Sequence, residues 1–150
     1  MTRKLDSTDW RIVKELMADG SLTNVALAGK VGLSAPPSLR RVRALEEAGV
    51  ITGYTALVDE RALGFDLTAF AMVGLHKQAE ADLRAFENRI LGWPIVREAY
   101  MLSGESDYIL KCVTRDLPAF QEFILKELTA VPNVASVKTT MPMTRASVMR

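Results

Sequence analysis

Residues 31–43 read VGLSAPPSLRRVR, a glycine turn that leads into the start of a basic helix. Ser34 is predicted to be the N-cap of this helix. Pro36 and Pro37 fall in its first turn, where backbone N–H groups have no intrahelical partner and proline is tolerated. Because prolines lack the N–H groups that a capping hydroxyl accepts from, we expect the Ser34 hydroxyl to remain available to face a phosphate. The helix should run on to Gly49.

The two sides of this helix differ in polarity. At ~100° per residue, Arg40 is predicted to point outward, with Arg41 and Arg43 beside it, and Ser38 falls on the inward side. The other inward residues are predicted to be Leu39, Val42 and Leu45.

Two shorter helices are predicted before the basic one. Asp6 is the expected N-cap of the first, and Asp9 three residues later is the acidic partner of a capping box. Thr23 is the expected N-cap of the second, and Gly32 supplies the sharp turn that follows it. The apolar spacing predicts inner faces made of Trp10, Val13, Leu16 and Met17 in the first helix, and of Leu27, Ala28 and Val31 in the second.

A short helix, a tight turn and a basic helix in this order are typical of a helix-turn-helix, whose second element lies in the major groove of DNA. Residues 1–45 carry eight Lys or Arg residues and four acidic residues, a local net charge of +4 in a chain whose net charge is +1. A protein-binding three-helix bundle remains the alternative. The candidate DNA contacts are Lys30, Ser34, Ser38, Arg40, Arg41 and Arg43, and Ser38 ranks below the arginines.

The second half of the chain alternates strand and helix patterns. Residues 50–58 are predicted to form a strand or wing that leads into a connector. Strands follow at 67–76, 95–103, 108–114 and 134–141, and helices at 80–91 and after Asp116. The order βαββαβ predicts a ferredoxin-like sandwich, so the fold class is α+β, with a (winged) helix-turn-helix followed by a ferredoxin-like domain. The predicted boundaries are 1–52 for the DNA-binding domain, 53–64 for the connector and 65–150 for the second domain.

The strand at 67–76 is apolar on both faces, since Ala69, Ala71 and Val73 alternate with Phe70 and Met72. A sheet with two apolar faces needs helices on one side and another cover on the other. We therefore expect a homodimer.

The composition argues against several other classes of protein. One cysteine, Cys112, and one histidine, His76, exclude an internal disulfide and a Cys/His metal cage, and no metal or other cofactor is expected. Neither a catalytic constellation nor the glycine-aromatic signature of RNA-recognition domains is present, so an enzyme is not expected. No apolar run approaches the ~20 residues that span a bilayer, and a cytoplasmic protein is expected.

Five pieces of the sequence together resemble the Lrp/AsnC (leucine-responsive, feast/famine) family of regulators along nearly the whole chain. They are Leu5-Asp6 with Asp9, Val31-Gly32-Leu33-Ser34, Leu39-Arg40-Arg41-Val42 with Leu45-Glu46, Gly49-Val50-Ile51 with Gly53-Tyr54, and Ser103-Gly104 with Asp107-Tyr108.

The resemblance implies a sequence-specific transcriptional regulator that binds double-stranded DNA and senses an amino acid or a related metabolite. It also implies dimers that assemble into octamers or larger discs, around which DNA can wrap. The implied effector-binding residues are Gly104, Asp107, Tyr108, Thr139 and Thr140. The N–H groups of a glycine-containing hairpin suit a carboxylate, and an acidic side chain suits an ammonium group. The family commonly has an aromatic residue where Ser106 stands here, so an architectural DNA-binding protein without an effector remains the alternative.

Overall fold

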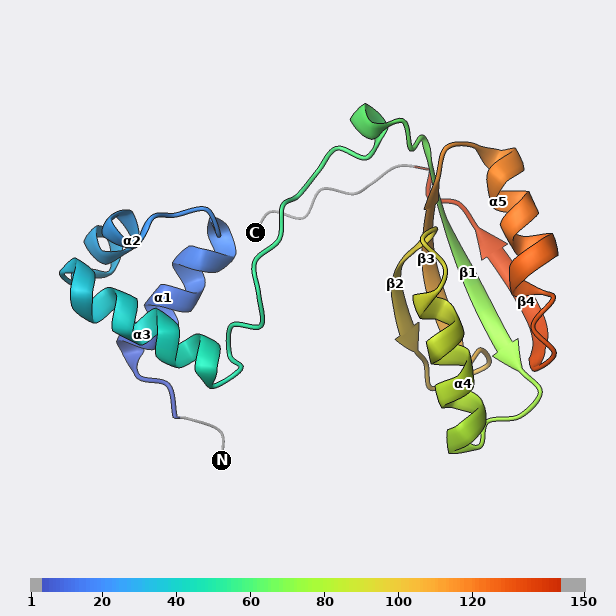
Figure 1. The fold of residues 1–150 in the computed structure, drawn as a ribbon, viewed down its shortest axis with the longest axis horizontal. Helices are drawn as coiled ribbons and strands as arrows, with labels where there is room; N and C mark the ends of the chain where they lie inside the picture. The colour runs from blue at the N-terminus through green and yellow to red at the C-terminus, as the bar shows by residue number, and fades with distance from the viewer. Residues whose placement is uncertain (1–3, 144–150) are drawn as a thin grey trace. The chain divides into compact units, whose positions relative to one another are not determined.

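The computed structural model describes residues 4–143, which form two compact units, residues 4–57 and 58–143 (Figure 1). The division falls inside the predicted connector. Residues 144–150, which the sequence assigns to the second domain, lie outside the described residues, as do residues 1–3. Within residues 4–143, no helix has both the length and the apolar character needed to cross a membrane.

The first unit is built from three helices, α1 (Ser7–Ala18), α2 (Asn24–Val31) and α3 (Ala35–Glu47). Its core consists of the buried residues Ile12, Leu27, Val31 and Leu45. Each helix alone could bury little apolar surface, so the three become stable only by sharing this core.

The predicted N-caps and the glycine turn are confirmed, whereas α3 ends at Glu47, two residues before the predicted Gly49. The backbone N–H of Asp9 donates to Asp6 Oδ1 at 2.8 Å, and the N–H of Asp6 donates to Asp9 Oδ2 at 3.3 Å, which completes the capping box. Thr23 Oγ1 accepts from the N–H of Ala26, and Gly32 has a left-handed φ of 72°. Ser34 makes no side-chain capping bond, as its two prolines predict.

The predicted inner face of α1 is partly right, because Val13 and Leu16 pack against the core, but it is wrong for Trp10 and Met17. Trp10 and Met17 are 62% and 74% exposed, whereas Asp9 and Ile12 are buried. The apolar pattern is misleading here because a carboxylate takes a place in the core, where a cation on another helix pairs with it. Leu39 in α3 is likewise exposed rather than inward.

The second unit is a four-stranded antiparallel sheet with helices, and its strand order is β2-β3-β1-β4. The βαββαβ order of the sequence is confirmed, apart from shifts at the element ends, and the last helix closes in a π-helical turn, η2. The elements are β1 (Leu67–Leu75), α4 (Glu80–Leu91), β2 (Val96–Met101), β3 (Tyr108–Thr114), α5 (Leu117–Phe123), η2 (Ile124–Leu128) and β4 (Val134–Thr140).

The core of the second unit lies between one face of the sheet and the helices. Ala69, Ala71 and Val73 of β1 face it, and the Trp93 and Phe123 rings meet edge to face with centroids 5.2 Å apart. Cys112 is buried in this core, and burial raises the pKa of its thiol to about 12. The thiol is therefore protonated and unreactive at neutral pH.

Of the strand or wing and connector predicted over residues 50–58, the structure shows an extended connector without a strand. The only helical turn between α3 and β1 is η1 (Arg61–Leu63). A strand needs a neighbour to pair with its backbone groups, and none of the four described strands pairs with this segment. Tyr54 in the segment donates from its hydroxyl to Glu46 Oε1 at 2.8 Å, which holds it to the end of α3.

Candidate DNA-binding and effector sites

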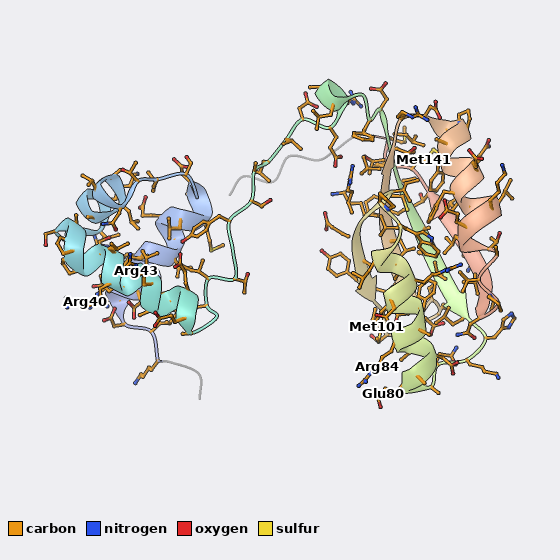
Figure 2. All side chains as sticks on the ribbon, in the orientation of Figure 1. Arg40, Arg43, Glu80, Arg84, Met101 and Met141 are labelled. Carbon is orange, nitrogen blue, oxygen red and sulfur yellow. The ribbon has the colours of Figure 1, made fainter. Side chains whose placement is uncertain are left out.

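Two arginines of α3 project outward from the first unit, Arg40 and Arg43 (Figure 2). They are three residues apart, so they lie on neighbouring positions of one helix face. Neither makes an ion pair with any residue in the part of the chain that the structure describes. Two exposed guanidinium groups on the second helix of a helix-turn-helix can bind a phosphate or a guanine edge.

Arg41 lies differently from its two neighbours. Its Nη1 lies 2.7 Å from Asp6 Oδ2 and 2.8 Å from Asp9 Oδ1, so it joins α3 to the N-terminus of α1. These hydrogen bonds raise the pKa of Arg41, while the N–H of Asp9 and the guanidinium hold the pKa of Asp6 below its usual value. The sequence placed Arg41 with the DNA contacts, but the structure gives its guanidinium a role within the first unit. Asp9, 1% exposed, is its buried partner.

The other predicted DNA contacts differ in their exposure. Ser38 is 0% exposed and its hydroxyl is buried, so it cannot meet DNA in this conformation, and its place in the predicted contact set is corrected. Ser34 is exposed at the start of α3 with its hydroxyl free of a capping bond. Lys30 is about half exposed and its Nζ lies 3.2 Å from Glu15 Oε2.

Asn24 positions α3, and the sequence analysis did not identify this role. Its Nδ2 donates to the carbonyl oxygen of Ala35 at 2.7 Å, across the turn from the start of α2 to the start of α3. This bond fixes how the second helix leaves the turn. An asparagine at the start of a helix is usually interpreted as a cap, so the sequence carries no signal for a bond across the turn.

The hairpin between β2 and β3 has a distinctive backbone. Gly104 has a φ of 154°, which side chains rarely allow, and nothing lies within 4 Å of the position that a Cβ would take. Asp107 Oδ2 accepts from the N–H of Leu75 at 2.6 Å, and the N–H of Asp107 donates to the carbonyl of Val73. Asp107 therefore clamps the hairpin to the end of β1. Its Oδ1 has no hydrogen-bond partner among the described residues.

Tyr108 is not at the surface of the hairpin. It is 2% exposed, its ring packs on Phe86 with centroids 5.0 Å apart, and its hydroxyl donates to Glu87 Oε1 at 3.2 Å. Burial is the main reason that the pKa of Tyr108 rises to about 12, and the Glu87 carboxylate adds to it. The predicted effector contact is thus a core residue in this chain.

Thr139 and Thr140 are exposed on β4, where they pair with Ala71 and Phe70 of β1. The hairpin instead lies beside Val73, two to three residues further along β1, so the structure does not bring the two threonines to it directly. A residue that the sequence analysis missed does reach β4: Glu105 Oε2 lies 3.7 Å from Lys138 Nζ.

Models of known families match both units of the chain. One, described as the Lrp/AsnC ligand binding domain, matches residues 68–148, and one described as a winged helix-turn-helix DNA-binding domain matches residues 5–52. The chain belongs to the Lrp/AsnC family.

The similar proteins are transcriptional regulators, and the similarity extends over most of their length. The leucine-responsive regulatory protein of Rhizobium meliloti (strain 1021) is 58% identical over 136 residues, which cover 91% of this chain and 87% of that protein. The Bkd operon transcriptional regulator of Pseudomonas aeruginosa is 44% identical, with 90% and 88% covered. A Neisseria meningitidis transcriptional regulator solved in complex with L-Met has a TM-score of 0.90 at 33% identity, with 97% of this chain and 94% of that chain covered.

The Lrp/AsnC assignment settles the broad function of the two units. This protein is a DNA-binding transcriptional regulator with a ligand-binding domain, and it is not an enzyme. The predicted fold class is also confirmed, because the helix-turn-helix is followed by the ferredoxin-like sheet.

Because Tyr108 is buried, we expect the ligand-binding domain to lose stability at alkaline pH. The folded pKa of Tyr108, about 12, lies above the ordinary value of 10.0, so the folded state holds this proton more tightly than the unfolded state. The stabilisation is complete below pH 10 and is lost as the pH rises toward 12. We expect the free energy of unfolding to fall less steeply between pH 10 and 12 in Tyr108→Phe than in the wild type.

Urea unfolding of both proteins at a series of pH values measures this difference. Tyr54→Phe is the control, because it removes a tyrosine hydroxyl that lies in the first unit, where it donates to Glu46. Identical pH dependence of Tyr108→Phe and the wild type would contradict the prediction.

Proposed function

We propose that this regulator binds double-stranded DNA with the outward face of α3, and that an amino acid or related metabolite at the hairpin of residues 104–107 alters its assembly and DNA binding. The observation that carries the proposal is the contrast within α3. Arg40 and Arg43 are exposed and free of ion pairs among the described residues, whereas Arg41 between them is held by two carboxylates. Arg41 keeps α3 in place, and its neighbours meet the DNA.

Ser34 and Lys30 complete the proposed DNA-binding surface. The free hydroxyl of Ser34 lies at the N-terminus of α3, where the positive end of the helix dipole favours a phosphate. The exposed ammonium group of Lys30 can exchange Glu15 for a phosphate at little cost, since exposed ion pairs are weak.

We propose that two chains pair through the face of the sheet opposite its core. Pairing across the strands aligns Tyr100 of β2, Ile109 of β3 and Met72 of β1 in one apolar row on that face. Covering the row with a second copy removes it from water. The pair presents two α3 helices to successive major-groove faces, and assembly to an octamer or larger ring multiplies the number engaged.

The effector proposal rests on the hairpin. Gly104 leaves its backbone open to a carboxylate, and Asp107 Oδ1 is free among the described residues to accept from an ammonium group. Thr139 and Thr140 join this site only through a second copy, as a single chain holds them apart from the hairpin. The Neisseria relative in complex with L-Met supports a zwitterionic ligand. Like other DNA-binding regulators, the protein would work in the cytoplasm.

Alanine substitution of Arg40 and Arg43 tests the DNA-binding face. On DNA from upstream of its own coding sequence, we expect each variant to bind about tenfold more weakly, because an arginine contact to a base contributes roughly 1–3 kcal/mol. The slope of log affinity against log salt should fall by about one for each phosphate that the variant can no longer bind. Fluorescence anisotropy at several salt concentrations measures both quantities.

Arg84→Ala is the matched control, because it removes the same charge from α4 of the other unit, where Arg84 pairs with Glu80 (Figure 2). Unchanged, salt-sensitive affinity in the Arg40→Ala/Arg43→Ala double variant would refute the proposed surface. Footprinting and light scattering with and without the twenty amino acids test the effector. An unchanged footprint and an unchanged size would favour an architectural protein.

A further inference from the structure

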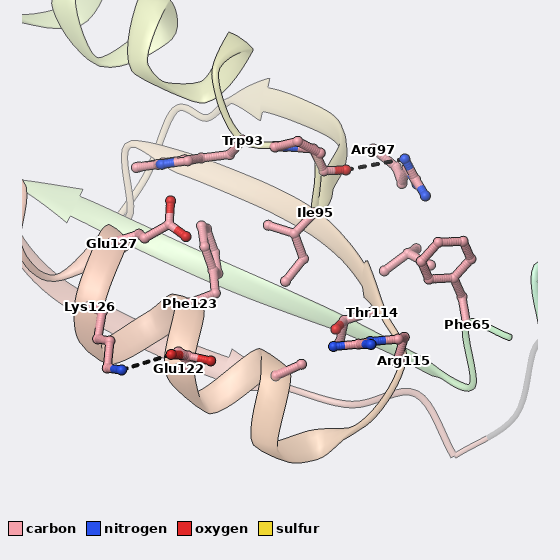
Figure 3. A pocket seen from close by; sticks show the side chains of 13 residues that line it. Phe65, Trp93, Ile95, Arg97, Thr114, Arg115, Glu122, Phe123, Lys126 and Glu127 are labelled. Atoms are coloured by element: carbon pink, nitrogen blue, oxygen red, sulfur yellow. Dashed lines mark hydrogen bonds and ion pairs between the residues drawn. The ribbon is translucent and has the colours of Figure 1, made fainter.

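A pocket of about 680 Å³ opens on the helix-covered side of the second unit, away from the hairpin (Figure 3). It lies between α5, the turn from α4 into β2 and the end of β3. Because β3 begins at the hairpin and ends at the pocket, its seven residues separate the two places by roughly 20 Å. The pocket is therefore distinct from the proposed effector site.

The walls of the pocket are mostly apolar. Trp93 and Phe123 meet edge to face and form an apolar wall with Ile95, the Glu127 carboxylate lies beside the two rings, and Phe65 lies at one end. Ala119 of α5 also lines the pocket. Its volume is in the range of small-molecule sites, which are typically apolar with a few polar groups that orient the ligand. An apolar body of the size of one aromatic ring fits this lining.

The three cationic side chains at the rim of the pocket differ in whether they already have hydrogen-bond or ion-pair partners. Arg97 donates from Nη1 to the carbonyl of Pro94 at 3.1 Å, lies over the Phe65 ring and has Nε 4.0 Å from Glu60 Oε1. Lys126 is paired with Glu122 at 2.7 Å, so those two charges cancel. Arg115 is exposed, and none of its guanidinium nitrogens has a partner among residues 4–143. It is the cation at this rim that is available to an anion.

We propose that this pocket binds an organic monocarboxylate with an apolar body, whose carboxylate pairs with Arg115 and whose body lies against the wall formed by Trp93, Ile95 and Phe123. The aromatic walls supply the affinity for the body, and the planar guanidinium can hold a carboxylate through two parallel hydrogen bonds. The pocket lies on the helix side of the sheet, so pairing of two chains through the opposite face leaves it open.

Trp93 makes the proposal directly measurable. The chain has two tryptophans, and the other, Trp10, is exposed in the first unit. In full-length Trp10→Phe, emission therefore reports on the pocket wall. Three probes separate the ligand's features: 3-phenylpropionate has both charge and ring, 3-phenylpropionamide has the ring alone, and inorganic phosphate has charge alone.

We expect saturable quenching or a spectral shift with 3-phenylpropionate, binding at least about tenfold weaker with the amide, and no saturable change with phosphate. Arg115→Ala should weaken 3-phenylpropionate about tenfold, whereas Arg84→Ala should leave it unchanged. Ala119→Leu fills the pocket and should abolish the response while the far-ultraviolet spectrum stays the same.

Several outcomes would overturn the proposal: equal affinity for the acid and the amide, unchanged affinity in Arg115→Ala, or no saturable response to any probe. The Asp107→Asn variant separates this site from the hairpin. It should bind 3-phenylpropionate with wild-type affinity whether or not the hairpin binds amino acids. The pocket proposal and the effector proposal are therefore tested separately.

Discussion

Arg41→Ala is expected to destabilise the three-helix unit by about 3 kcal/mol, because it removes a cation that pairs with the buried carboxylate of Asp9. Asp9 is almost fully buried, and Arg41 Nη1 lies 2.8 Å from its Oδ1. Breaking one partner of a buried pair costs more than the pair contributes, because the remaining charge stays out of water. Arg41→Lys should recover only part of the loss, since the shorter lysine side chain does not carry its nitrogen as far as the position from which Arg41 Nη1 contacts both carboxylates.

Hydrogen exchange of α1 and α3 in the full-length protein measures the effect, since it reads the stability of this unit alone. Arg43→Ala is the matched control, an exposed arginine two residues further along α3 that should change protection very little.

A double-mutant cycle with Asp9→Asn gives the decisive comparison. Without the buried charge, the cost of Arg41→Ala should shrink by more than half. The opposite pattern, normal protection in Arg41→Ala with a loss of DNA affinity as large as that of Arg40→Ala, would return Arg41 to the DNA contacts.

Arg41 also marks the limit of what the sequence could predict in the first unit. The caps, the glycine turn and the order of helices follow from local rules, so they were predicted to within a residue or two. The buried face of α1 was not predicted correctly, because the hydrophobic spacing favoured Trp10 and Met17 over Asp9 as inward residues. Only knowledge that Arg41 lies opposite Asp9 makes a buried carboxylate reasonable, and that is a contact across 32 residues.

The second unit shows the same division between local and long-range information. Alternation and turn composition located the four strands, and Asp116 caps α5 as expected, accepting from the N–H of Ala119. The hairpin residues were identified, but the burial of Tyr108 depends on Phe86 and Glu87 of α4, which no local pattern reveals. The pocket could not be predicted from the sequence either, because its lining residues are spread over residues 65 to 127 and come together only in the folded domain.

Asp107 offers a substitution pair that separates structure from ligand recognition. Asp107→Ala removes the acceptor of the Leu75 N–H, a half-buried bond of 2.6 Å, and should cost the second unit about 1–3 kcal/mol as that donor loses its partner. Asp107→Asn keeps an oxygen for Leu75, so its stability should stay close to the wild type. The asparagine nevertheless lacks the negative charge that would pair with the ammonium group of an amino acid.

We therefore expect Asp107→Asn to fold normally and to bind L-methionine or L-leucine at least about tenfold more weakly, because a charge-assisted hydrogen bond is replaced by a neutral one. Calorimetric titration gives the affinity, and hydrogen exchange of β1 gives the stability. Glu105→Gln is the matched control, because it removes a hairpin charge that is almost fully exposed and 3.7 Å from Lys138. If Asp107→Asn bound as tightly as Glu105→Gln, the aspartate would be a structural clamp alone and the ammonium group would have to find its partner elsewhere.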